Sequence, residues 1–298
     1  MKFITFNSNG KEKLGVLNEE HQNVWDIEQL SLDSAIDCPA SLLEGIKEGE
    51  SFIQSISRLI EWGEAQASHK YSIPLTEIQW LSPIPKPQKN IMCVGKNYRD
   101  HAIEMGGEAS IPEHVMVFTK APTSVTGHDA IIDAHEDITS ELDYEGELAV
   151  IIGKAGKGIK QEDALEHVFG YTILNDITAR DLQQRHQQFF IGKSLDTSCP
   201  IGPWIVHKDS IQNPNQLQIE TKVNGEIRQK SNTEHFIFPI EEVISVLSQG
   251  MTLEPGDIIA TGTPAGVGKG FNPPRFLKSG DEIEITIENI GRLNNIVK

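Results

Sequence analysis

Short stretches in which apolar and polar side chains alternate recur along the chain, and such alternation is typical of half-buried β-strands. The clearest one runs from Asp281 to Glu288. Apolar runs predict further strands at residues 90–94, 115–119, 147–152, 171–174, 218–223, 258–260 and 283–287. Asn9-Gly10 and Asn224-Gly225 follow strand-like stretches. We expect hairpin turns at both, because Asn and Gly tolerate positive φ angles.

Two segments have the 3.6-residue periodicity of helices instead. In the first, apolar residues recur at positions 52, 56, 59 and 60, and Ser51 stands where a side chain can cap the free amides. The second begins at Pro239 and ends at Gly250, with apolar residues at positions 240, 243, 244 and 247. Helices and strands do not alternate regularly, which disfavours a Rossmann fold or a TIM barrel.

A proline-rich stretch at residues 83–88 divides the chain. Three prolines, Pro83, Pro85 and Pro87, exclude a helix interior and predict a stiff connector. The sequence therefore predicts an α+β, β-rich fold with a small N-terminal α+β domain at 1–82 and a larger domain at 89–298.

The composition is that of a globular protein, with 38% hydrophobic and 23% charged residues among 298. The formal net charge of −17 repels DNA, RNA and anionic lipid, so we expect no nucleic-acid partner and no membrane association. No signal-like apolar core follows Met1, and no apolar run approaches the ~20 residues that span a bilayer. Cys38, Cys93 and Cys199 are far apart, which indicates free thiols in a reducing cytoplasm.

Acidic residues gather where one predicted strand begins and another ends. Asp143, Glu145 and Glu147 are spaced two apart, so in a strand they share one face. Asp176 follows a second apolar run and can bring a further carboxylate to them. A cluster of this kind selects hard cations such as Mg²⁺, Mn²⁺ or Ca²⁺. The same spacing is also typical of a solvated strand edge, and the spacing alone does not separate the two interpretations.

Residues 97–107 read as a short helix that Asn97 can cap and Gly106 or Gly107 can end. His101 and Glu104 are three apart and face the same way. A carboxylate beside an imidazole orients the ring and raises its basicity, as a general base requires. The flanking glycines suit a lid segment. A surface His–Glu pair is the alternative interpretation.

Three further segments carry groups suited to an anionic substrate. Arg180 and Gln183 share a face near a predicted helix start, although an ordinary polar helix face has the same pattern. Lys193 lies in a loop of small residues, where most lysines are simply solvated. The turn at 262–270 is not a Walker A motif, and we expect it to present Thr263 and backbone amides to a carboxylate.

Taken together and in order, these motifs resemble the fumarylacetoacetate hydrolase (FAH) family over residues 89–290. The matching stretches are Cys93-Val94-Gly95-Lys96-Asn97-Tyr98, His101-x-x-Glu104, Asp143-Tyr144-Glu145-Gly146-Glu147-Leu148, Asn175-Asp176-Ile177-Thr178-Ala179-Arg180-Asp181, Gly192-Lys193-Ser194-x-Asp196 and Thr261-Gly262-Thr263-Pro264-x-Gly266-Val267-Gly268. The first 80 residues carry none of them.

The resemblance implies a mixed β-roll core, a homodimer, and Mg²⁺ or Mn²⁺ on Glu145, Glu147 and Asp176. It also implies a lid dyad of the acylpyruvase and oxaloacetate decarboxylase branch, here His101 and Glu104. Its catalytic lysine and substrate-contacting positions match Lys193, Arg180 and Gln183, with Thr263 as a further candidate.

The expected activity is divalent-metal-dependent cleavage of a C–C bond in a small 2-oxo acid, as oxaloacetate decarboxylation or acylpyruvate hydrolysis. One alternative is an isomerase or decarboxylase of the 2-hydroxyhepta-2,4-diene-1,7-dioate type in aromatic catabolism, or hydratase chemistry. Another is a metal-bound structural or regulatory protein that docks through its N-terminal domain.

Overall fold

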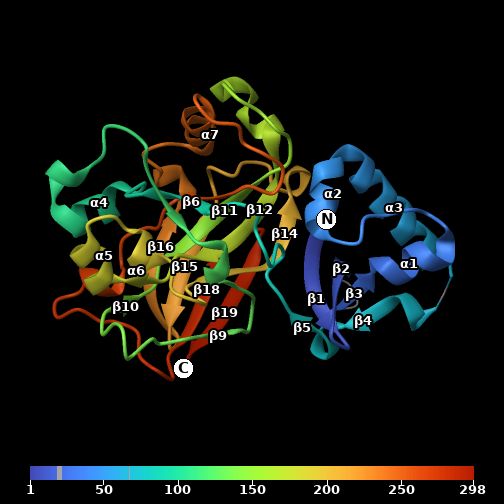
Figure 1. Ribbon diagram of the computed structural model, residues 1–298, viewed down its shortest axis with the longest axis horizontal. Helices are drawn as coiled ribbons and strands as arrows, with labels where there is room; N and C mark the ends of the chain where they lie inside the picture. The colour runs from blue at the N-terminus through green and yellow to red at the C-terminus, as the bar shows by residue number, and fades with distance from the viewer. Residues whose placement is uncertain (19–21, 67) are drawn as a thin grey trace.

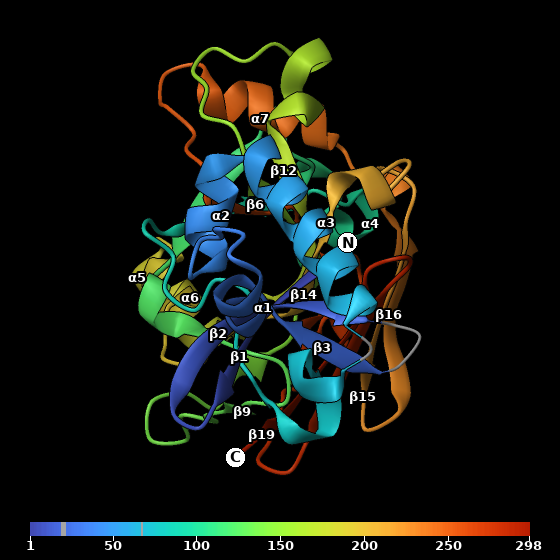
Figure 2. The ribbon, with the colours of Figure 1, turned by 90° about the vertical axis from the view of Figure 1, so that its right-hand side faces the viewer.

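The computed structural model describes residues 1–18, 22–66 and 68–298, which form a β-rich body with a smaller N-terminal part at its side (Figure 1). The N-terminal elements are β1 (Lys2–Ser8), β2 (Lys11–Asn18), β3 (Asn23–Asp26), α1 (Ile27–Ser34), α2 (Leu42–Glu48), α3 (Glu50–Ala65), β4 (Ser72–Pro74) and β5 (Gln79–Trp80). Figure 2 shows the three helices lying together on the outer side of these strands.

The larger part holds the remaining strands and four helices. Its strands are β6 (Ile91–Gly95), β7 (Met116–Lys120), β8 (Val125–Thr126), β9 (Ile131–Ile132), β10 (Leu142–Asp143), β11 (Gly146–Ile152), β12 (Val168–Asn175), β13 (Thr178–Ala179), β14 (Cys199–His207), β15 (Gln218–Val223), β16 (Glu226–Asn232), β17 (Ile258–Ala260), β18 (Glu282–Ile287) and β19 (Gly291–Val297). Its helices are α4 (Arg99–Gly106), α5 (Arg180–His186), α6 (Phe190–Lys193) and α7 (Ile240–Ser248).

One large sheet runs through both parts in the order β4-β3-β2-β1-β14-β12-β11-β17-β6-β7, and a second has the order β16-β15-β18-β19-β9. The link between the parts is the antiparallel pairing of β1 with β14, in which Phe3 lies opposite Ile205. The rings of Phe52 on α3 and Phe169 on β12 each lie 5.4 Å from that of Phe3. The two parts therefore share a hydrophobic core, and the division at residues 83–88 stays a prediction.

Strand β11 lies at the centre of the large sheet and is buried on both faces. Leu148 and Val150 pack into the core that the second sheet covers, whereas Ala149 and Ile151 pack into the core shared with the N-terminal part. Burial on both faces explains why this strand is a continuous apolar run rather than an alternating one.

The predicted strands, both hairpins and the helix that follows Pro239 are confirmed, with shifts of up to three residues at some ends. Two predicted helix caps are wrong. Helix α3 begins at Glu50 after Gly49, with no side-chain cap from Ser51. Asn97 does not cap α4, because its buried side chain bonds to Phe238 and Thr261 instead. Among the described residues no helix is long and apolar enough to cross a membrane.

We expect Phe52→Ala to destabilise the whole chain by about 3–5 kcal/mol, because it removes a ring from the core that both parts share. Denaturant unfolding followed at the N-terminal tryptophans and by far-ultraviolet circular dichroism should give coincident transitions at a lower midpoint. Loss of the N-terminal signal alone, with the remaining structure intact, would contradict a shared core.

Candidate metal centre

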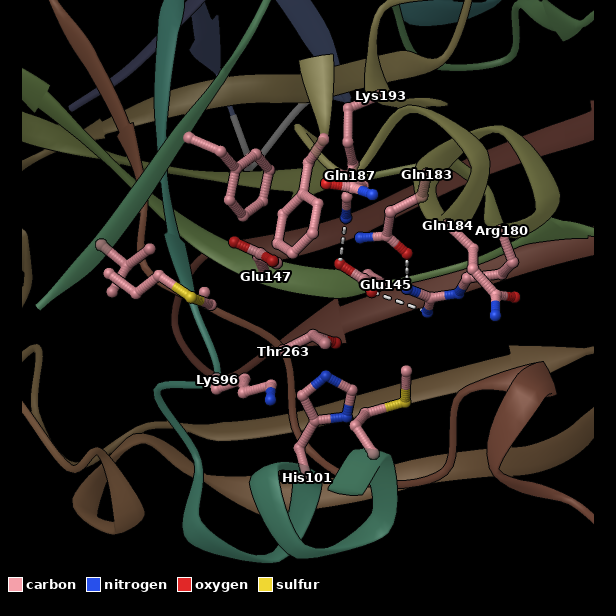
Figure 3. Close-up of a pocket in the computed structure, with 16 residues that line it drawn as sticks. Lys96, His101, Glu145, Glu147, Arg180, Gln183, Gln184, Gln187, Lys193 and Thr263 are labelled. Atoms are coloured by element: carbon pink, nitrogen blue, oxygen red, sulfur yellow. Dashed lines mark hydrogen bonds and ion pairs between the residues drawn. The ribbon is translucent and has the colours of Figure 1, made fainter. Parts of the chain in front are cut away.

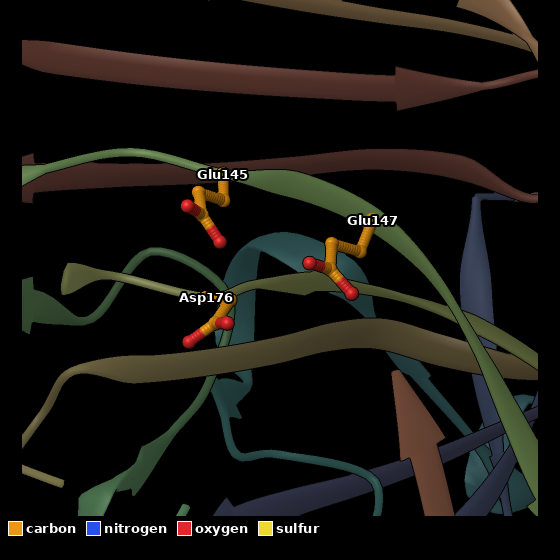
Figure 4. Close-up of side chains that lie close together, drawn as sticks. All are labelled: Glu145, Glu147 and Asp176. Atoms are coloured by element: carbon orange, nitrogen blue, oxygen red, sulfur yellow. The ribbon is translucent and has the colours of Figure 1, made fainter. Parts of the chain in front are cut away.

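Three carboxylates converge where β11 begins and β12 ends. The antiparallel register sets Gly146 opposite Asn175, so Glu145 and Asp176 flank the same pair. The Asp176 amide donates to the Glu145 carbonyl at 2.9 Å. Glu145, Glu147 and Asp176 each offer an oxygen within 4.8 Å of the others (Figure 4). Their exposed fractions are 5%, 1% and 0%, so the alternative of a solvated strand edge is wrong.

Basic side chains surround two of these three acids. The Lys193 ammonium bridges Glu145 and Asp176, with Nζ–O distances of 2.7 and 2.6 Å. Lys120 lies 2.8 Å from the other Asp176 oxygen, and Arg180 lies 2.7 Å from the other Glu145 oxygen. Burial by itself raises a carboxyl pKa, but Lys193 and Arg180 hold the pKa of Glu145 well below its ordinary value.

Glu147 lacks such a partner. Its carboxylate accepts a hydrogen bond from the Gly262 amide at 2.8 Å and has no ion pair among the residues that the structure describes. Burial and the neighbouring charges of Asp176 and Glu145 raise the pKa of Glu147 well above its ordinary value. Lys120, Arg180 and Lys193 therefore neutralise Glu145 and Asp176 but leave the buried charge of Glu147 without a basic partner.

This donor set fits a hard divalent cation. All three ligands are carboxylate oxygens, which Mg²⁺ and Mn²⁺ prefer over softer donors. The raised pKa of Glu147 means that its negative charge is unfavourable there, so a nearby positive charge would stabilise the carboxylate. The Lys193 ammonium supplies part of this charge at Glu145 and Asp176.

Asp143 does not join the cluster, contrary to the prediction that it lines up with Glu145 and Glu147. Residues 144 and 145 lie between β10 and β11, so the strand alternation breaks there. The fully buried Asp143 carboxylate accepts from Arg180 Nε at 2.9 Å and from the amides of Gly268 and Lys269 at 2.6 and 3.0 Å. Asp143 thus ties the 262–270 turn to the arginine beside the triad.

Two members of the triad, Glu145 and Glu147, line a cavity of about 410 Å³, whereas Asp176 is not part of its lining. Most of the predicted site residues line it, and Figure 3 shows them converging from α4, β11, α5, α6 and the 262–270 turn: His101, Glu145, Glu147, Arg180, Gln183, Lys193 and Thr263. Four further polar groups at this site were not predicted from the sequence, namely Lys96, Gln184 and Gln187 in the lining and Lys120 against Asp176. For Lys96 a signal existed, because it lies within the family-like stretch at residues 93–98.

The predicted His–Glu pair forms, and its histidine lines the cavity rather than facing solvent. His101 Nδ1 lies 3.2 Å from Glu104 Oε2, and His101 is only 5% exposed. The second oxygen of Glu104 accepts from the Gly266 amide at 2.9 Å, which fastens α4 to the 262–270 turn. With Nδ1–H donating to Glu104, the Nε2 atom of His101 carries a free lone pair.

Arg180 and Thr263 are already engaged within the protein. Arg180 contacts Asp143 and Glu145, and its Nη1 donates to Gln183 Oε1 at 3.3 Å. Thr263 Oγ1 donates to the Gly146 carbonyl at 2.9 Å and accepts from a glutamine amide. Substrate contacts by these residues stay predictions.

Comparison with known proteins identifies the family. The Fumarylacetoacetate (FAA) hydrolase C-terminal family matches residues 90–298. The chain belongs to the fumarylacetoacetate hydrolase family. The resemblance drawn from the sequence motifs is thereby confirmed, and so is the expected β-rich FAH fold.

Similar proteins within this family carry several activities in their names. The chain is 59% identical to oxaloacetate tautomerase YisK of Bacillus subtilis (strain 168) over 95% of its own length and 92% of that protein. It is 43% identical to a solved fumarylacetoacetate hydrolase from psychrophilic Exiguobacterium antarcticum, with a TM-score of 0.84 over 100% and 99% of the two chains. A 2-hydroxyhepta-2,4-diene-1,7-dioate isomerase from Mycobacterium marinum superposes with a TM-score of 0.74 at 30% identity, over 100% and 98%.

The raised pKa of Glu147 predicts how ion binding depends on pH. A proton and the ion compete for this carboxylate, so the stabilisation that Mn²⁺ gives should grow as the pH rises above the range in which an ordinary glutamate titrates. Glu147→Gln should remove the stabilisation while leaving the ion-free protein as stable as wild type or more so, because a buried acid disappears. Thermal melts with and without Mn²⁺ measure both effects, with the exposed Glu136→Gln as control. Equal Mn²⁺ stabilisation of Glu147→Gln would contradict the site.

The close approach of Gly270 to Glu104 gives a second test. A Cβ at Gly270 would lie 2.1 Å from Glu104 Oε1, so Gly270→Ala should push that carboxylate away from His101. We expect the catalytic rate to fall roughly 10–100-fold with Mn²⁺ affinity unchanged, because general-base catalysis depends on ring orientation. Gly250→Ala is the control, since nothing lies within 4 Å of its added methyl. An unchanged rate in Gly270→Ala would show that the Glu104 contact is dispensable.

Proposed function

We propose that the protein catalyses divalent-metal-dependent proton transfer at the carbon next to the keto group of a small 2-oxo acid, with keto–enol tautomerisation of oxaloacetate as the leading reaction. The observation that carries this proposal is that one cavity is lined both by His101, which pairs with Glu104, and by Glu145 and Glu147 of the buried carboxylate triad. The name of the Bacillus subtilis relative supports the choice of substrate and reaction.

Each protein group has a definite part in such a transfer. A divalent ion on Glu145, Glu147 and Asp176 would polarise the keto group as a Lewis acid. His101 accepts the C3 proton at Nε2, while Glu104 fixes the ring and stabilises its protonated form. The C–H electron pair becomes the C2–C3 double bond, and the C=O π pair moves onto the C2 oxygen. That oxygen takes a proton from water and His101 returns its proton to water, so the net change is one proton moved from C3 to oxygen. Lys193 offers an ammonium where negative charge develops on that oxygen.

The cleavage reactions expected from the sequence use the same groups and stay predictions. Decarboxylation of oxaloacetate requires stabilisation of the same developing charge but no general base. Hydrolysis of an acylpyruvate requires His101 and Glu104 to activate a water molecule. Isomerisation of a dienoate moves a proton along a longer conjugated chain. A purely structural or regulatory protein would accelerate none of these reactions above the rate given by the metal ion alone.

The decisive assay follows the enol form of oxaloacetate by its ultraviolet absorbance with Mg²⁺ or Mn²⁺, alongside pyruvate release and acetylpyruvate consumption. We expect tautomerisation to be the fastest reaction, to be lost in Glu145→Ala, and to fall by about 10²–10⁴-fold in His101→Ala with Mn²⁺ affinity retained. His235→Ala, which changes an exposed histidine, serves as control. Faster pyruvate release than tautomerisation would favour decarboxylase, and no acceleration by wild type would refute the proposal.

A further inference from the structure

One basic residue in the cavity takes no part in the charge balance of the triad. Arg180 and Lys193 line the cavity and are both paired with buried carboxylates. Lys96 lines the same cavity and is half-buried, and its ammonium has no ion pair or hydrogen bond within residues 1–18, 22–66 and 68–298. A half-buried lysine that lines a cavity and has no ionic partner favours an anion that enters the cavity.

The backbone holds Lys96 in this place against its conformational preference. Its φ angle of 54° lies in the left-handed region, which is unfavourable for a residue with a Cβ. The neighbouring Asn97 keeps the turn in this shape, since its buried amide donates to the carbonyls of Phe238 and Thr261 at 3.0 and 2.8 Å. Asn97 Oδ1 also accepts from the Phe238 amide at 2.8 Å. Strain that is over-determined by its surroundings is typical of ligand-binding positions.

The position of Lys96 suits the far end of a substrate. Figure 3 draws Lys96 and His101 on the side of the cavity opposite Lys193 and Gln183, with the carboxylates of Glu145 and Glu147 between the two sides. A 2-oxo acid whose carboxylate and keto oxygen face the triad would present its C3 carbon to His101. A substituent on C3 would then extend toward the side of the cavity that holds Lys96.

We infer that Lys96 is a specificity-determining residue that binds the second carboxylate of a short 2-oxo dicarboxylic acid. This inference rests on the proposed function and narrows its substrate class. A monocarboxylic 2-oxo acid would leave the Lys96 ammonium without its anion. The cavity lining also includes the apolar residues Val94, Met105 and Met116, which bring no competing charge.

The test compares two substrates that differ only at this end. Oxaloacetate carries a carboxylate on C3, and 2-oxobutyrate carries a methyl group there. With Mg²⁺ in deuterium oxide, nuclear magnetic resonance measures deuterium incorporation at C3 for both. We expect Lys96→Gln to lower kcat/KM for oxaloacetate by about 10–100-fold, mainly by raising KM. The kcat/KM for 2-oxobutyrate should change less than about twofold. Lys96→Arg should retain most of the preference for oxaloacetate over 2-oxobutyrate.

Controls separate this inference from the proposed function. Lys154→Gln removes one exposed lysine charge elsewhere and should change neither substrate. L-malate and 2-hydroxybutyrate are analogues without a keto group, so their calorimetric binding reports recognition without turnover. We expect Lys96→Gln to abolish the preference for malate.

The role of Lys96 would be overturned if Lys96→Gln lowered kcat/KM equally for both substrates. It would also be overturned if Lys96→Gln used oxaloacetate and bound malate as well as wild type does. If wild type showed no deuterium exchange but bound malate more tightly than 2-hydroxybutyrate through Lys96, only the proposed reaction would be refuted.

Discussion

The site depends on the electrostatic repulsion among three buried carboxylates that the fold holds close together. The antiparallel register of β11 and β12 fixes where Glu145, Glu147 and Asp176 meet, and burial prevents water from screening them. Three basic side chains from separate segments partly neutralise these charges, and all of them contact Glu145 or Asp176: Lys120, Arg180 and Lys193. Glu147 is left with a single backbone amide, and this imbalance is the physical reason to expect an ion.

The same electrostatic arrangement organises the groups around the triad. Asp143 holds Arg180 against Glu145 on one side and the amides of the 262–270 turn on the other. That turn gives its Gly262 amide to Glu147 and its Gly266 amide to Glu104. Helix α4 and the triad are therefore fastened to one short segment. A change in the charge of the triad has a direct structural route to the His101–Glu104 pair.

The sequence predicted the strands well because both local signals were strong: alternation for β18 and a long apolar run for β11. It also predicted the His101–Glu104 pair, because spacing within one helix determines which side chains share a face. The triad followed from the family resemblance, since Glu145 lies before β11 and Asp176 comes from a second strand end. The sequence failed where long-range contacts decide. Asn97 has the residue type of a helix cap, but its partners are Phe238 and Thr261, more than 140 residues away. Lys120 could not be tied to Asp176 from spacing, since 56 positions separate them. Asp143 was misplaced because the chain leaves the strand for two residues after it.

The most direct test is an anomalous-scattering map of crystals grown with Mn²⁺. The account predicts one strong peak within about 2.0–2.4 Å of an oxygen from each of Glu145, Glu147 and Asp176, with the Lys193 ammonium displaced from at least one of them. Crystals that contain Mn²⁺ in excess but show no peak there, with Lys193 still bridging Glu145 and Asp176, would contradict it.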